Sequence, residues 1–273
     1  MNKIIIAVFD SEEAAYDGVA ALKDLHSDGD ISLYASSIIA KDAAGAVTVR
    51  QAADSGPLGT LVGIVAGGLV GLLGGPAGAL VGGWLGGGAG LAYDLFSVGV
   101  GVDLMDQVGT SLTPGKVAVV ADIDETSTTS VDTRLDAIGA TVFRRYPSEV
   151  ADEQLAREAE AAEVEMRHLD AELEQADVEA KAKAQAIAAA QREKLEALVA
   201  RVEASIKQEK AEIKARLATL HAQLDGARER QRNRIETRIN EATAAHLARQ
   251  DKLEEAREHA KAALELTRGA IRA

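Results

Sequence analysis

Residues that commonly carry chemistry are sparse in this chain. It contains no cysteine, which excludes a thiolate nucleophile, a zinc-thiolate cluster, an iron-sulfur site and a disulfide framework. The five histidines are too far apart in sequence to form a local ligand set, and no HExxH segment is present; they are His26, His168, His221, His246 and His259. No Ser/His/Asp set is indicated. We therefore expect no metal site, no cofactor and no catalytic residue.

One acidic segment has a spacing used in phosphoryl transfer. An apolar run from Val117 to Ala121 leads into Asp122, Asp124 and Thr126. This order resembles the Asp-x-Asp-x-Thr loop of haloacid-dehalogenase-type phosphatases, which implies one carboxylate attacking phosphorus and a second acting as acid and base. That chemistry also needs a downstream lysine and a magnesium-binding acidic pair on a large parallel sheet. Because only about 20 residues remain before a helical region, we interpret the segment as an acidic loop after a strand.

A second segment, GTSLTPGK from Gly109 to Lys116, is similar to a phosphate-binding P-loop. It has one residue too many, and Val117 stands where Ser or Thr should hold magnesium. We expect a Pro-Gly turn into a strand instead. These sequence features predict a protein that is not an enzyme and has no small-molecule substrate.

Composition divides the chain near Pro147. All four prolines lie in residues 1–147, which carry 17 acidic and 8 basic side chains. The net charge of the whole chain is -13, which argues against nucleic-acid binding because phosphate contacts need Lys and Arg. The aromatic share of 3% argues against one large core. We expect two regions, residues 1–147 and 148–273.

The first region combines strand and helix patterns. β-branched apolar runs predict strands at Lys3–Phe9, Ile31–Lys41, Ala46–Gln51, Lys116–Ile123 and Thr141–Tyr146. A helix is expected after Ser11, which is a favourable N-cap, and a short one at Val131–Ile138, closed by Gly139. Two strand-helix-strand units with a hairpin strand between them predict an α+β fold of the ferredoxin-like kind.

An uncharged, glycine-rich segment is inserted in this region. The 39 residues between Asp54 and Asp94 carry no charge, and Pro76 divides them into two apolar arms. Glycine recurs at nearly every fourth position, a spacing that lets a second helix approach closely: Gly59, Gly63, Gly67, Gly71, Gly75, Gly78, Gly82, Gly86 and Gly90. Each glycine disfavours a helix in water by about 0.8 to 1 kcal/mol relative to alanine, so the predicted hairpin at 55–93 needs lipid or tight packing.

Two interpretations of this hairpin stay open. It inserts in or docks on a membrane, with Trp84 and Tyr93 as interfacial anchors, or it is buried inside a soluble protein assembly. The arms are short for the roughly 17 to 25 residues that span a bilayer as a helix. The sequences that flank the hairpin include Asp54 and Asp94. They lack the excess of Lys and Arg that is usual beside a membrane-spanning helix.

Several of these segments together resemble a known family. The strand IIIAVFD, the pair SSIIAKDAAGAVTVRQA, the glycine-rich hairpin and LTPGKVAVVAD are similar to an uncharacterised bacterial family of predicted membrane proteins, a domain of unknown function. The resemblance covers about residues 1–147. It implies a ferredoxin-like domain with a Gly-rich helical insertion and an envelope or stress association, and it assigns no activity. The C-terminal extension departs from the family's usual pattern.

Residues from Ser148 onward are dominated by strong helix formers. A seven-residue repeat and then an eleven-residue repeat of apolar positions predict a coiled-coil seam: Leu155, Met166, Leu169, Leu173, Leu195, Val202, Ile206, Ile213, Leu217, Leu224, Ile235 and Ile239. Gly226 is the expected turn if this arm folds back on itself. A basic patch follows it, either a solvated helix face or a docking site for an acidic surface, formed by Arg228, Arg230, Arg232, Arg234 and Arg238.

The sequence thus favours a non-enzymatic, self-assembling structural protein that uses the hairpin at a membrane and the helical arm for homo-oligomerisation. The alternative is a soluble filament- or shell-forming protein with the hairpin as its buried core. A pore-forming protein is a third possibility. The first apolar run ends at Asp10, too early for a secretory signal. We therefore expect the cytoplasmic side of an inner membrane, with lipid and further copies of the chain as partners.

Overall fold

The computed structural model describes residues 2–53, 56–73, 102–145, 150–175 and 178–272. These residues form two compact units. The first unit joins Met1–Ser148 with Glu212–Ala244, and the second joins Glu149–Ala211 with Ala245–Ala273. The expected boundary at Pro147 therefore marks where the first segment ends, but a later part of the helical region also belongs to the first unit. We call Glu212–Ala244 the hairpin tip and the rest of the first unit the head.

The head is built on a five-stranded antiparallel sheet in the order β3-β2-β4-β1-β5. The strands are β1 (Asn2–Phe9), β2 (Ile31–Lys41), β3 (Val47–Gln51), β4 (Val117–Glu125) and β5 (Thr141–Arg145). All five expected strands are confirmed to within two residues at each end. The difference that matters is at β4, which continues through Glu125 because Asp122 to Glu125 pair with β2. The acidic loop expected after this strand is therefore wrong.

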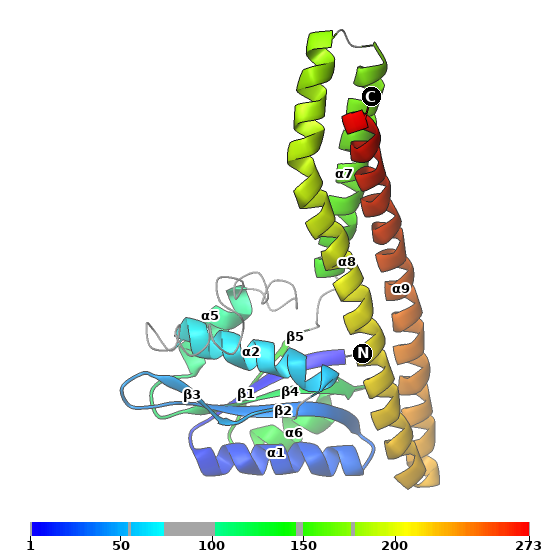
Figure 1. Cartoon of the computed structure of the whole chain (residues 1–273). Helices are drawn as coiled ribbons and strands as arrows, with labels where there is room; N and C mark the ends of the chain where they lie inside the picture. The colour runs from blue at the N-terminus through cyan, green and yellow to red at the C-terminus, as the bar shows by residue number, and fades with distance from the viewer. Residues whose placement is uncertain (1, 54–55, 74–101, 146–149, 176–177, 273) are drawn as a thin grey trace. The chain divides into compact units, whose positions relative to one another are not determined.

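Helices α1 (Glu12–Ser27) and α6 (Thr128–Asp136) cover one face of the sheet (Figure 1). The Ser11 side chain accepts a hydrogen bond from the Ala14 amide and caps α1 as expected. Helix α6 begins three residues before the expected Val131 because Ser127 caps it. Leu22, Leu25, Val131 and Leu135 bury their side chains against Ile5 and its neighbours on this face.

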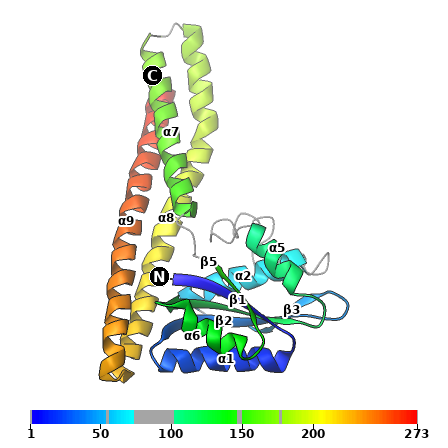
Figure 2. The ribbon, with the colours of Figure 1, turned by 180° about the vertical axis from the view of Figure 1, so that it is seen from behind.

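Helices α2 (Pro57–Leu73) and α5 (Val102–Ser111) cover the opposite face, which is the upper one in both Figure 1 and Figure 2. The apolar side chains of α2 pack against β2, β3 and β4. Val62, Val65 and Leu69 are fully buried there. The first arm of the expected hairpin is thus a core helix of the head. Gly109 of α5 lies so close to α2 that an added Cβ would be 2.8 Å from Leu73 Cδ2.

The helical region consists of α7 (Val150–Gln175), α8 (Val178–Gly226) and α9 (Glu229–Arg272). The chain turns between Gly226 and Glu229, at the expected glycine. In the second unit, Glu158 and Glu165 of α7 contact Arg201 and Gln191 of α8, respectively. Glu203 and Glu209 of α8 pair with Lys261 and Arg249 of α9. In both sets the partner's number falls as the residue number rises, so α8 runs antiparallel to both neighbours. The eleven-residue rows from Leu195 to Ile239 cross this turn, so their members lie on two helices.

The second unit has its own apolar core along the three helices. Seven of the expected seam residues lie in it: Leu155, Met166, Leu169, Leu173, Leu195, Val202 and Ile206. Small residues, including Ala159, Ala188, Ala256 and Ala260, complete the core and are fully buried. Among the described residues, no helix has both the length and the apolarity that crossing a membrane requires.

Candidate functional site

Three acidic side chains are buried at the end of β4. Asp122 is 0%, Asp124 4% and Glu125 2% exposed, in a strand whose preceding residues are all apolar. Side chains alternate between the faces of a strand, so Asp122 and Asp124 share the face that α2 covers further along, and Glu125 lies on the α1 and α6 face. A buried carboxylate needs a cation or hydrogen-bond donors, and each face supplies them differently.

On the first face, Arg216 of the hairpin tip reaches into the head. Its Nη2 donates to Asp122 Oδ2 at 2.6 Å, and its Nη1 lies 3.4 Å from Oδ1. The Asp122 side chain is fully buried and that of Arg216 is 9% exposed. Burial raises the pKa of Asp122 to about 6 in spite of the arginine beside it. Burial also disfavours the charged guanidinium, but Asp122, Tyr34 and Asp124 together outweigh this effect and raise the pKa of Arg216.

Tyr34 completes this site through an irregularity in β2. The strand register shifts between Leu33, which pairs with Ile123, and Ala35, which pairs with Asp122, leaving Tyr34 as an extra residue. Its hydroxyl donates to Asp124 Oδ2 at 2.7 Å, and its ring centre is 4.5 Å from the Arg216 guanidinium carbon. Burial and the Asp124 carboxylate raise the pKa of the Tyr34 hydroxyl above its ordinary range.

The opposite face holds a network made within the head alone. Glu125 Oε1 accepts hydrogen bonds from Lys3 Nζ at 3.1 Å and from Arg144 Nε at 2.8 Å. Arg144 Nη2 also lies 2.6 Å from Asp132 of α6. The pairing with Glu125 and Asp132 overcomes the effect of burial and raises the pKa of Arg144. This network ties β1, β4, β5 and α6 together.

The hairpin tip makes further contacts with the segment that joins α1 to β2. The Gln223 amide donates to the His26 carbonyl at 2.6 Å and to the Ile31 carbonyl at 2.7 Å, and the Ser32 hydroxyl donates to Gln223 Oε1 at 2.6 Å. Gln231 donates to the Asp28 carbonyl at 2.7 Å. We call the head residues contacted by the tip the docking face: His26, Asp28, Gly29, Asp30, Ile31, Ser32, Tyr34, Asp122 and Asp124.

Two of the five predicted patch arginines contact this docking face. Arg238 is 1% exposed and donates to the Gly29 carbonyl at 2.8 Å, and Arg234 pairs with Asp30. Burial lowers the pKa of Arg238, and its Nε has no hydrogen-bond partner among the described residues. Arg228, Arg230 and Arg232 are not buried. The five residues are therefore not one continuous patch.

The predicted packing glycines also differ from one another in burial. Gly59 and Gly67 of α2 are buried, Gly63 is exposed and Gly71 is half-buried. A Cβ added at Gly63 or Gly67 would meet no described atom within 4 Å. Gly75, Gly78, Gly82, Gly86 and Gly90 lie outside the described residues. Of the remaining seam positions, Ile235 is buried in the tip, whereas Ile213, Leu217, Leu224 and Ile239 are half-buried.

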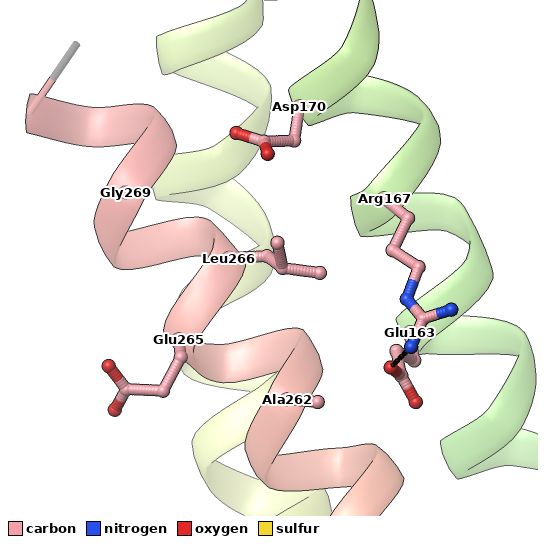
Figure 3. Close-up of a pocket in the computed structure, with 7 residues that line it drawn as sticks. All are labelled: Glu163, Arg167, Asp170, Ala262, Glu265, Leu266 and Gly269. Atoms are coloured by element: carbon pink, nitrogen blue, oxygen red, sulfur yellow. Dashed lines mark hydrogen bonds and ion pairs between the residues drawn. The ribbon is translucent and has the colours of Figure 1, made fainter.

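The second unit contains a shallow groove between α7 and α9 (Figure 3). It has a volume of about 440 Å³ and is lined by Glu163, Arg167, Asp170, Ala262, Glu265, Leu266 and Gly269. Arg167 pairs with Glu163, which also accepts a contact from His259 and has its pKa lowered chiefly by that histidine. Glu265 points away from this pair in Figure 3. The groove therefore presents no converging set of polar groups.

One segment with catalytic spacing lies at the end of β4, and the other lies in the last turn of α5 and the turn that leads into β4. Asp122 and Asp124 do share a face, as their spacing requires, but Arg216 contacts both oxygens of Asp122 and Tyr34 donates to Oδ2 of Asp124. Among the described residues, no group of three His, Asp or Glu side chains is arranged to hold a metal ion. Thr113 to Lys116 forms the expected turn into β4, with Gly115 at a φ of +90°.

Sequence reasoning missed Tyr34 and the partners of the β4 acids. Acidic residues directly after an apolar strand run were the available signal, because a strand buried on both faces cannot hold them without cations. Which arginine would serve could not be read from the sequence, since Asp122 and Arg216 are 94 residues apart.

Comparison with known proteins gives one match. The model of a family described as Protein of unknown function (DUF1269) matches residues 60–160. The matched range starts in α2, includes α5, β4, α6 and β5, and ends in the first turns of α7. This is consistent with the resemblance to an uncharacterised family and assigns no activity. No curated protein and no solved structure matches the sequence.

Proposed function

We propose that this protein is a non-enzymatic, self-assembling structural protein in which the uncharged glycine-rich segment packs against protein. The observation that carries this proposal is the burial of Val62, Val65 and Leu69 of α2 in the core of the head. The first arm of the apolar segment already has a protein surface as its partner. The uncharged sequence continues for 20 further residues, to Tyr93, and this apolar stretch needs cover as well.

The polar sites support a structural role. Each buried acid of β4 has a basic or hydroxyl partner within hydrogen-bond distance, so these residues hold elements of the head and tip together. In this arrangement Asp122 is 0% exposed and is not accessible to a substrate.

The finer architecture fits a scaffold. The order β2-β4-β1-β5, with α1 and α6 as the crossover helices on one face, supports a ferredoxin-like head to which β3 adds an edge strand. Buried positions Leu155, Ala159, Met166, Leu169 and Leu173 are spaced by three, four or seven residues, which supports coiled-coil packing in the second unit.

A second candidate is a membrane-associated form of the same scaffold. It is favoured by the absence of any charge from Ser55 to Tyr93, with Trp84 and Tyr93 as aromatic residues suited to an interface. In this form the apolar segment contacts lipid instead of further copies of the chain.

A glycine substitution in α2 tests the self-assembly. Because Gly63 is exposed and no described atom lies within 4 Å of a Cβ added there, the variant Gly63→Leu is expected to keep its fold by circular dichroism. Leucine blocks the close approach of another helix, so light scattering in lipid-free buffer should show large particles for the unchanged chain and a lower mass for the variant. Gly269→Leu, at an exposed helical glycine of α9, is the matched control and should keep the large mass.

Liposome flotation with carbonate washing separates the two candidates. Flotation of the unchanged chain that resists carbonate would replace the soluble assembly with the membrane-associated scaffold. A chain that neither floats nor exceeds its monomer mass of 28.5 kDa would contradict both.

A further inference from the structure

The docking face and the hairpin tip carry opposite charges. The docking face contributes Asp30, Asp122 and Asp124, and the tip contributes Arg216, Arg234 and Arg238. Arg216 pairs with Asp122, Arg234 pairs with Asp30, and Arg238 donates to two backbone carbonyls next to these acids. The two surfaces therefore recognise each other by charge and by hydrogen-bond geometry.

Polar contacts dominate this surface. None of the three apolar clusters in the described residues includes a residue of Glu212–Ala244. The tip has two fully buried apolar side chains, Leu220 and Ile235, each six residues from its end of the turn. Leu220 lies between Arg216 and Gln223 on α8, and Ile235 lies between Gln231 and Arg238 on α9, so both are on the helix faces that contact the head. Separating the tip from the head thus exposes these two apolar side chains, and otherwise groups that water can solvate.

The same contacts can be made between two molecules. Head and tip are joined only through residues 149–211 and are far apart in sequence, as the 94-residue separation of Asp122 and Arg216 shows. A tip from a second copy presents identical atoms to the docking face. Exchange of an identical element therefore changes no contact, and concentration and the connecting chain decide between the two forms.

We propose that the docking face is an interaction surface for the hairpin tip of a second copy of this chain, which takes the place of the molecule's own tip. This inference rests on the proposed self-assembly and names the surface through which copies join. Each chain has one docking face and one tip, so exchange closes as a reciprocal pair or continues from chain to chain.

The absence of cysteine from the chain gives a direct test. Asp30→Cys and Arg234→Cys replace the two partners of a partly exposed ion pair, so each variant loses little stability. One variant carries an affinity tag, and the two full-length proteins are mixed, incubated and treated with a short bismaleimide. The expected result is a covalently cross-linked heterodimer, which runs at twice the mass of one chain on a denaturing gel. In the exchanged form, the thiol introduced in place of Asp30 on one chain faces the thiol introduced in place of Arg234 on the other.

A contact that cannot be exchanged provides the control. Asp10 and Lys116 pair at 2.9 Å within the head, beside the paired strands β1 and β4. Mixed Asp10→Cys and Lys116→Cys proteins should form no cross-linked heterodimer after the same treatment. A single chain carrying both Asp30→Cys and Arg234→Cys reports that the two positions are close in either form.

The outcomes separate this inference from the proposed function. If the double variant cross-links only within one chain and mixing yields no heterodimer, arm exchange is wrong. Light scattering of the unchanged chain then decides independently whether the protein assembles by another surface. Heterodimer at the level of the control pair would equally overturn the exchange.

Discussion

One face of strand β4 is covered in two different ways along its length. Ala118 and Val120 lie under α2, in an apolar core with Val65 and Leu69. Asp122 and Asp124 continue the same face under the hairpin tip, where Arg216 and Tyr34 meet them. The strand is equally buried at both places, but its side chains change from apolar to acidic.

This difference separates a permanent contact from a reversible one. Removing α2 would expose apolar surface, at a cost of about 25 cal/mol for each Å² returned to water. Apart from Leu220 and Ile235, removing the tip exposes charges and amides that water solvates, so the net loss is smaller than the sum of the bonds broken. We infer that α2 is part of the folded core and that the tip can separate while the head stays folded.

Truncating the apolar cover is expected to have the largest effect. Leu69 is fully buried between α2 and the sheet, so Leu69→Ala removes its transfer free energy and leaves a cavity. The free energy of unfolding of the head should fall by about 2 to 5 kcal/mol. Urea denaturation, followed by circular dichroism, measures the change.

Thr60→Ala, at an exposed position of the same helix, is the control and should change stability by no more than about 0.5 kcal/mol. Equal losses for the two variants would show that α2 is not packed on the sheet. The contrast between the two covers of β4 would then fail.

Removing Arg216, the cation that covers Asp122, should lower hydrogen-exchange protection in the tip alone. Arg216→Met leaves Asp122 without its partner, and opening of the tip lets water solvate that carboxylate. Hydrogen-exchange protection of amides in Glu212–Ala244 should fall at least about tenfold, which corresponds to about 1.4 kcal/mol. Protection in β1 and β4 should stay unchanged.

The paired variant Asp122→Asn/Arg216→Met removes both charges and should recover part of the lost protection. If β1 loses protection as much as the tip does, the tip is an integral part of the head. The cover made by Arg216 would then be as permanent as that made by α2.

Local patterns predicted the elements of the head well. The β-branched runs gave all five strands, and Ser11 marked the start of α1 because an N-cap is a contact within one turn. The end of β4 was missed for a tertiary reason. Asp122, Asp124 and Glu125 are poor strand formers and pair with β2 because their charges are compensated from elsewhere.

The long helical region shows the same limit. Heptad spacing identified core residues such as Leu155 and Leu169, since burial on one helix face repeats along the sequence. The eleven-residue repeat joined Val202 to Ile235 across the turn after Gly226, although these residues lie in different helices and units. The docking site depended on such long-range contacts, so Arg216 and Tyr34 could not be assigned in advance.

The smallest expected effect is the pH dependence of tip docking, because two groups oppose each other. The pKa of Asp122 is raised from 3.8 to about 6 by burial, so its contribution to stability is complete below 3.8 and is lost as pH rises through about 6. Arg216, Tyr34, Asp124 and Glu212 surround it and set that balance. Taken alone, Asp122 makes docking weaker toward neutral pH.

His26 has the opposite sign. Burial, and then the charge of Arg238, lower its pKa from 6.5, and its Nδ1 accepts the Leu33 amide at 3.2 Å as a neutral ring. Its contribution is complete above 6.5 and is lost as pH falls through its lowered pKa. Amide protection of the tip between pH 4 and 7 should therefore change little in the unchanged chain. Protection should rise with pH in Asp122→Asn and fall with pH in His26→Gln, and equal slopes in the two variants would show that neither group senses docking.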